Sequence, residues 1–207
     1  MKIILKTDIL AQNYGYHVFK TWDTSEDLNG WTLSVASGDV DGDGKGELIV
    51  GDYDNNLYIF EHMVNNTYKR AFRSFDINYT EVSSTSPYYW EELEGISGTF
   101  NRVFWNHVDE LLAGMDLDRD GLSELVAAAG MQLYVFEDTG IDDTYSLVYY
   151  IDFRDSMFNE TVGWDNVNRI TALAAGNDLD YNVERELIVG VGPYLFVYNI
   201  PYNAWDN

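Results

Sequence analysis

The feature that most constrains this chain is an acidic nine-residue segment that occurs three times, each time directly before an apolar run. The copies span residues 39–47, 116–124 and 178–186. The first two follow the pattern D-x-D-x-D-G-x-x-E, whereas the third has Asn182 and Val183 at positions 5 and 6. Oxygen-bearing side chains at positions 1, 3, 5 and 9 of a tight turn can point to a common centre. The pattern therefore predicts a cage for a hard cation.

Short apolar or alternating segments surround each acidic segment at nearly constant spacing, which makes the whole unit a repeat. An aromatic content of 15%, with 16 Tyr and 6 Trp, also favours strands. The expected strands are 33–36, 48–50, 57–60 and 68–77 in the first copy, 111–113, 125–128, 133–136 and 145–153 in the second, and 170–174, 187–189 and 195–198 in the third. Because no segment shows a sustained helical period, we predict an all-β fold. It is a β-propeller-like array of about three four-stranded blades.

The repeats divide a single domain, residues 1–207, into consecutive parts. The expected division is N-terminal strands at 1–30, blade 1 at 31–80, an inserted link at 81–107, blade 2 at 108–157 and blade 3 at 168–200. A closed propeller usually has four to eight blades, so the array is expected to be part of a larger propeller. Two further arrangements are open: the strand Tyr16–Trp22 completes the third sheet, or strand edges pair with neighbouring copies of the chain.

The acidic loops have the ligand chemistry of calcium, which takes six to eight oxygen ligands from carboxylates, carbonyls and water. Position 7 is expected to contribute its backbone carbonyl, and glycine at position 6 permits a positive φ. The absence of His and Cys from the loops argues against zinc or copper. The predicted ligand residues are Asp39, Asp41, Asp43, Lys45 and Glu47; Asp116, Asp118, Asp120, Leu122 and Glu124; and Asp178, Asp180, Asn182, Glu184 and Glu186.

The third loop is the incomplete one. Asn182 can bind calcium, but the β-branched Val183 disfavours positive φ, so this loop is expected to turn differently or to bind more weakly. An EF-hand shares the first six positions but needs a bidentate Glu at position 12 and flanking helices. Position 12 is Val50, Ala127 and Val189 in the three copies, and the expected flanks are strands, so the EF-hand alternative fails.

The acidic loops between an Ala/Gly-rich strand and a Leu-Ile-Val-Gly-type strand resemble the FG-GAP, or VCBS-type, repeats of integrin α-subunit-like β-propellers. The resemblance covers about residues 30–200, and the first two loops carry it. It implies that the loops bind Ca²⁺ on one side of a propeller. The FG and GAP tripeptides that name the family are absent, and Ser-Gly or Ala-Gly stands at 37–38, 113–114 and 175–176 instead.

The charge balance limits the partners. A net charge of −23 repels phosphate backbones and anionic lipids, so nucleic-acid partners are not expected. No apolar run approaches the ~20 residues that span a bilayer, so no membrane insertion is expected. No catalytic residue is predicted, because His17, His62 and His107 stand beside no nucleophile motif and no P-loop occurs.

These observations lead to two functional hypotheses. The first is a non-enzymatic, calcium-stabilised structural or adhesive module of a cell-surface or filament-forming protein, which binds other proteins or its own copies through sheet edges. Extracellular calcium modules bind with Kd of roughly 10⁻⁴–10⁻³ M, which favours an extracellular or cell-surface location. The alternative is a lectin or lyase-like propeller that binds or cleaves polysaccharide, with rings of Tyr88–Trp90 and Trp105 stacking on sugars. Candidate glycosylation acceptors are Asn65, Asn78 and Asn159.

Overall fold

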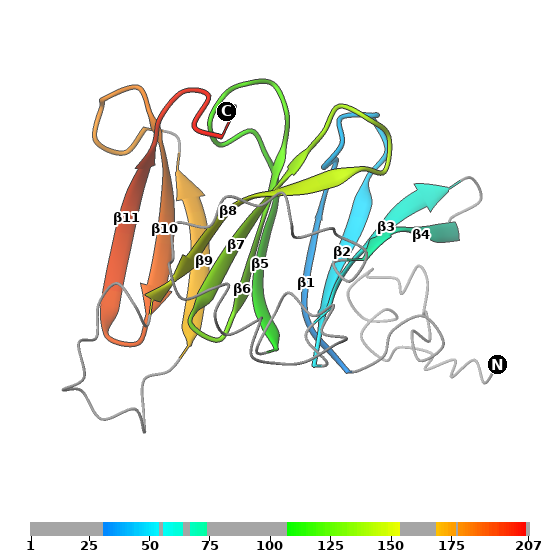
Figure 1. Ribbon diagram of the computed structural model, residues 1–207, viewed down its shortest axis with the longest axis horizontal. Coiled ribbons are helices and arrows are strands. Elements are labelled where there is room, and N and C mark those ends of the chain that lie inside the picture. The colour runs from blue at the N-terminus through cyan, green and yellow to red at the C-terminus, as the bar shows by residue number, and fades with distance from the viewer. Residues whose placement is uncertain are drawn as a thin grey trace, which may run out of the picture.

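The computed structural model describes residues 31–53, 56–63, 67–73, 107–153, 169–176 and 178–205. Their regular elements are β-strands, which form three antiparallel sheets (Figure 1). The first sheet contains β1 (Thr32–Gly38), β2 (Glu47–Asp52), β3 (Leu57–Met63) and β4 (Thr67–Arg73) in chain order. The second contains β5 (Val108–Met115), β6 (Glu124–Ala129), β7 (Gln132–Asp138) and β8 (Tyr145–Asp152). The third contains β9 (Ile170–Gly176), β10 (Arg185–Val191) and β11 (Tyr194–Ile200).

The sheets repeat one arrangement along the molecule. β1 contacts β5 and β5 contacts β9, so the first strands of the three sheets lie next to one another (Figure 1). The three sheets follow one another as the blades of a propeller do, which confirms the predicted all-β, propeller-like fold. The third sheet has three strands in the described part of the chain, which agrees with the three strands expected for the third copy.

The burial of the strands follows from the position of each sheet in the array. Every residue of β6 and β7 is buried, because the second sheet is covered on both faces. These strands are accordingly near-continuous apolar runs. In β11, by contrast, Phe196 and Tyr198 are partly buried whereas Leu195 and Val197 are 69% and 54% exposed. The third sheet therefore packs on the second with one face only.

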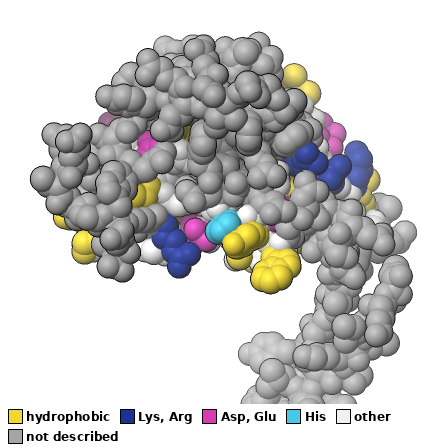
Figure 2. Space-filling view, turned by 60° about the horizontal axis from the view of Figure 1, so that its bottom comes forward, with side chains coloured by type: hydrophobic (Ala, Val, Ile, Leu, Met, Phe, Trp, Pro, Cys, Tyr) yellow, Lys and Arg dark blue, Asp and Glu magenta, His cyan; other side chains and the backbone are white. Residues whose placement is uncertain are grey.

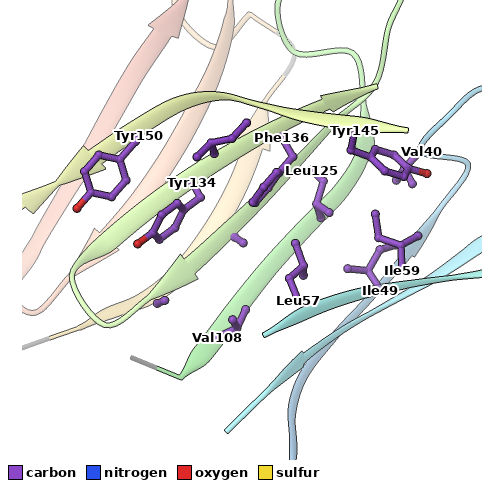
Figure 3. Packing of buried hydrophobic residues seen from close by; sticks show 13 residues of the cluster. Val40, Ile49, Leu57, Ile59, Val108, Leu125, Tyr134, Phe136, Tyr145 and Tyr150 are labelled. Atoms are coloured by element: carbon purple, nitrogen blue, oxygen red, sulfur yellow. The ribbon is translucent and has the colours of Figure 1, made fainter. Parts of the chain in front are cut away.

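Two hydrophobic layers hold the three sheets together. Between the first and second sheets, Ile49 and Ile59 pack with Leu125, Phe136 and Tyr145, as Figure 3 shows. Full burial of side chains of this size stabilises a fold by about 1.5–3 kcal/mol each. The second layer joins the second and third sheets through a corresponding set, which includes Val126, Leu133, Phe153, Leu187 and Val189.

The innermost strands approach closely at a pair of glycines. A Cβ atom built on Gly38 at the end of β1 would lie 3.1 Å from the Cα atom of Gly114 in β5. Gly114 also has a positive φ of 73°. Larger residues at either position would push the two sheets apart directly below the acidic loops.

The edge opposite the acidic loops carries an exposed aromatic group. It comes forward in Figure 2, where a histidine lies among hydrophobic and charged side chains. Tyr53 stacks on His107 with ring centroids 3.7 Å apart, and Trp31, 81% exposed, lies 6.3 Å from Tyr53. Nδ1 of His107 lies 2.6 Å from the carbonyl oxygen of Tyr53, so this histidine has a structural partner.

Several predicted features lie outside the described residues. They are the N-terminal strands including Tyr16–Trp22, residues 81–106 of the link, the ring group Tyr88–Trp90 with Trp105, residues 74–77 of the fourth strand of blade 1, His17, and the acceptors Asn65, Asn78 and Asn159. Among the described residues, no helix has the length and hydrophobicity that crossing a membrane requires.

Candidate metal centre

The three acidic loops lie at the same edge of the array (Figure 1). Each connects the first strand of a sheet to the second: 39–47 follows β1, 116–124 follows β5 and 178–186 follows β9. Because the three sheets repeat the same strand order, the repeat in the sequence becomes a row of loops in space.

The backbone of each loop is shaped by its own side chains. The position-3 carboxylate accepts a hydrogen bond from the backbone N–H of position 5, at 3.3 Å for Asp41 and Asp43. The position-5 side chain accepts one from the N–H of position 7, at 2.7 Å for Asp120 and Leu122. These bonds tie short polar side chains to the backbone two residues ahead, as in Asx turns. The same bonds recur in all three loops.

Positive φ angles at positions 4 and 6 complete the turn. At position 6, Gly44 has φ 86° and Gly121 has φ 100°, as the motif predicts. Val183 in the third loop also has a positive φ, 72°. Of the two outcomes expected for this loop, a different turn is excluded, and weaker binding stays a prediction. The side-chain bonds impose the same turn, and Val183 adopts a conformation that is unfavourable for a β-branched residue.

The glutamate at position 9 closes each loop in the same manner. One carboxylate oxygen accepts a hydrogen bond from the backbone N–H of position 2, at 2.6 Å from Glu47 to Val40 and 2.8 Å from Glu186 to Leu179. Glu124 makes the same bond to Leu117. The other oxygen of each glutamate is buried without a hydrogen-bond partner. A buried acceptor is costly to leave unpaired, so a ligand is the natural partner for these three oxygens.

The second loop is the most complete site. One oxygen from each of Asp116, Asp118, Asp120 and Glu124 lies within 4.8 Å of the others. Asp118 and Glu124 are buried, and Oδ1 of Asp116 has no partner. Burial, with the nearby carboxylates of Asp118, Glu137 and Asp116, raises the pKa of Glu124 to about 9. In the absence of a cation, the loop therefore holds more negative charge than its surroundings can accommodate.

The first loop brings only part of its predicted ligand set together. Asp39, Asp41 and Asp43 form one group of oxygens, which does not include Glu47. The ammonium group of Lys45 contacts both Asp43 and Glu61, and its hydrogen bonds lower the pKa of Asp43. Lys45 was predicted for its carbonyl oxygen, but its side chain acts as a local counter-ion. Burial and the loop aspartates raise the pKa of Glu47 to about 7.

The third loop gathers Asp178, Asp180 and Glu186, but it is more open than the others. Asp180 is exposed, and its carboxylate accepts hydrogen bonds from the side-chain amides of Asn182 and Asn199, at 3.1 and 3.2 Å. Two amide donors partly take the role that a cation has for a carboxylate.

A polar residue on the neighbouring strand pairs with the position-9 glutamate of each loop, and it was missed from the sequence. Glu47 pairs across the sheet with Glu61, Glu124 with Glu137, and Glu186 with Asn199. A side chain opposite position 9 points to the same face of the sheet and therefore toward the loop. The signal was present in the sequence, because an acidic or amide residue recurs at nearly the same distance after position 9.

Each of the first two loops is also held by the following sheet. The backbone N–H of Asp143, in the turn between β7 and β8, donates to Oδ2 of Asp41 at 3.3 Å. The N–H of Trp205, after β11, donates to Oδ2 of Asp118 at 3.3 Å. Trp205 follows Asp143 by the same number of residues that separates Asp178 from Asp116, so the two contacts are equivalent. The position-3 aspartate is thus a contact between sheets.

These residues fit calcium. The oxygens are carboxylates, they lie close enough together to share one ion, and buried oxygens of Glu124 and Asp116 have no other partner. The side chains at positions 1, 3, 5 and 9 would hold the ion, and the carbonyl ligands Lys45, Leu122 and Glu184 stay predictions.

No protein-family model and no curated protein matches this chain. Among solved structures, it is similar to a chain in the crystal structure of BBS1N in complex with ARL6DN, in crystals soaked with lead and in crystals soaked with mercury. The lead-soaked structure is 15% identical with a TM-score of 0.48, over 83% of this chain and 41% of the matched chain. The mercury-soaked one is 14% identical with a TM-score of 0.48, over 83% and 42%. This chain therefore spans less than half of the chains it matches. The fold assignment rests on its own three sheets.

Proposed function

We propose that this chain is a calcium-stabilised, non-enzymatic structural or adhesive module of a cell-surface or filament-forming protein. In this proposal, calcium ions in the acidic loops fasten successive sheets of a propeller-like array. The FG-GAP resemblance of the loops supports the same interpretation. We assign no catalytic role to the gathered carboxylates, because cation binding accounts for them.

The observation that carries the proposal is the state of loop 116–124. Four carboxylates share a small volume, and Glu124 is 1% exposed with one oxygen that no donor reaches. Without a cation, such a group is held together against its own repulsion and the cost of burial. A divalent ion removes both costs, which makes folding and calcium binding one coupled process.

The contacts of the loops with the following sheet define what the ion would stabilise. Asp41 and Asp118 each accept a backbone hydrogen bond from the next sheet. An ion that fixes the carboxylate of Asp41 or Asp118 also fixes the acceptor of that bond. Calcium would therefore strengthen the contact between sheets as well as the loop itself.

Partner binding is proposed through the parts of the array that are uncovered. In the described residues, β11 pairs with β10 only, so its other edge can accept a strand from another protein or another copy. Leu195 and Val197 of this strand are exposed. The extracellular location follows from calcium supply, since loops of this kind fill only where calcium is abundant.

The direct test is thermal unfolding of the full chain with calcium, with magnesium and after chelation, together with calorimetric titration of calcium. A free calcium concentration of 100 times the Kd of a site stabilises the fold by about 2.7 kcal/mol. For a chain of this size, each kcal/mol shifts Tm by about 2–4 °C. We expect calcium to raise Tm by at least the shift that corresponds to about 2.7 kcal/mol. The variant Asp120→Ala should lose part of this increase in Tm. Asp109→Asn, a change at an ion pair outside the loops, is the control. A chain that binds no calcium in the titration contradicts the proposal.

A further inference from the structure

The two contacts between loops and following sheets differ in one respect. At the second contact, the turn presents Ala204 and Trp205 to loop 116–124. At the first contact, the equivalent positions are Asp142 and Asp143, which face loop 39–47. The first contact thus brings two additional carboxylates beside a loop that is already acidic. Figure 1 shows this turn, between β7 and β8, reaching over to the first sheet.

These carboxylates form a group of their own. One oxygen from each of Asp41, Asp142 and Asp143 lies within 4.8 Å of the others, a spacing that suits ligands 2.3–2.6 Å from a shared ion. Oδ1 of Asp143 is buried without a hydrogen-bond partner. The exposed Lys69 reaches only Oδ2 of Asp143, at 3.9 Å. The group is therefore distinct from the one formed by Asp39, Asp41 and Asp43, with which it shares Asp41.

A buried hydroxyl group gives the second, independent observation. Tyr145 begins β8, is 7% exposed, and its hydroxyl has no hydrogen-bond partner. Figure 3 shows the ring lying beside Val40, with the hydroxyl on the side of loop 39–47. A buried phenol that has no partner and lies on the side of an acidic loop calls for a bound ion or water.

A neighbouring acidic group already has a cationic partner. Oxygens of Asp43, Glu61 and Asp142 also lie close together. The ammonium group of Lys45 contacts Asp43 and Glu61 there. Among the described residues, no such counter-ion reaches Oδ1 of Asp143 or the hydroxyl of Tyr145, which are buried without a hydrogen-bond partner.

We propose a bridging cation site between the first and second sheets, in which Asp41, Asp142 and Asp143 bind one calcium ion. The phenolic oxygen of Tyr145 faces the same ion from the apolar layer below. Water completes the coordination on the open side, where Asp142 is exposed. The site joins loop 39–47 directly to the following sheet. It goes beyond the loop ions of the proposed function and shares only Asp41 with them.

The test compares calcium stoichiometry of the full chain by native mass spectrometry and calorimetric titration. Asp142→Asn combined with Asp143→Asn should lose one bound ion relative to wild type. The control Asp109→Asn should keep the wild-type number. Removal of even an outer-shell partner weakens metal binding by about 10–100-fold. Tyr145→Phe should therefore weaken the binding of the bridging calcium ion by at least about tenfold in the titration.

Thermal unfolding of Tyr145→Phe gives a readout that a purely structural tyrosine would not produce. Phe keeps the ring and removes only the unpartnered hydroxyl. In chelator, we expect Tm of the variant to equal or exceed that of wild type. In calcium, we expect Tm of the variant to fall below that of wild type. A shift of the same sign in both conditions overturns the site, as does an unchanged ion count in the double variant. If wild type binds no calcium at all, the loop proposal fails as well, so the two failures are distinguishable.

Discussion

Loops 116–124 and 178–186 share the same turn but differ in their surroundings. The second loop lies between two sheets, with Leu117 and Asp118 buried and the turn around Asn203 and Trp205 donating backbone hydrogen bonds to Asp118. In the third loop, Leu179, Tyr181 and Val183 are 57%, 92% and 69% exposed. No following sheet covers this loop in the described part of the chain.

The comparison of these two loops separates the shape of the turn from its burial. Local side-chain bonds form the turn, and they do so even where Val183 replaces glycine. Burial, and with it the energetic demand for a cation, comes from the neighbouring sheet. Loops of nearly equal sequence can therefore differ widely in how much an ion stabilises them.

The largest expected effect on stability comes from replacing a position-3 aspartate. Asp118→Ala should destabilise the calcium-loaded chain by about 3 kcal/mol, because it removes a buried ligand and the acceptor for the N–H of Trp205. Asp180→Ala, at the exposed equivalent, should cost about 1 kcal/mol or less. Denaturant unfolding in calcium measures both. Equal losses would show that the neighbouring sheet does not set the importance of the loop.

The pH dependence of the calcium-free chain should report the burial of the second loop. The folded-state pKa of Glu124, about 9, lies above its ordinary value of 4.5. The folded state then binds the proton more tightly than the unfolded state, so stability should fall as pH rises from about 4.5 to about 9. Glu124→Gln should flatten this slope in unfolding measurements on chelated protein. With calcium bound, the carboxylate form is favoured, so the decline should be absent. A chelated wild type whose stability rises over this range contradicts the assignment.

Exchanging the position-6 residues should shift stability in opposite directions. A non-glycine residue held at positive φ costs about 1–3 kcal/mol. Val183→Gly should therefore stabilise the chain by about 1 kcal/mol, since part of the gain is offset by the greater backbone entropy of glycine in the unfolded state. Gly121→Val should destabilise it by at least that amount. A Cβ atom at Gly121 would meet nothing within 4 Å, so backbone conformation alone is tested. Thermal melts in chelator isolate this effect from calcium binding.

The smallest effect on stability is expected from restoring the missing carboxylate of the third loop. Asn182→Asp adds a charged ligand but removes the amide that donates to Asp180. Calcium affinity of this loop should rise about tenfold, because ligand charge sets affinity in such sites. In chelator the variant should be slightly less stable than wild type. Calorimetric titration of the variant against wild type checks the affinity, and an unchanged affinity would show that position 5 does not bind.

The part of the site that sequence predicted best is the part formed by neighbours in the chain. The turns at Gly44 and Gly121 depend on bonds between residues two positions apart, so the motif specifies them. Glu61 and Glu137 were missed because they join the loops through strand register, which pairs residues distant in sequence. Tyr145 carried no local signal, since its role depends on one sheet being placed against the next.

The amino-acid order by itself determined the repeat, the strands and the three acidic turns, because hydrophobic alternation and short-range hydrogen bonds act within a few residues. Only the tertiary structure decided which turns are buried, which carry a contact from the following sheet, and that Asp142 and Asp143 face the first loop. The physical reason is that desolvation and the repulsion between carboxylates depend on what packs around a loop, and those neighbours come from other sheets.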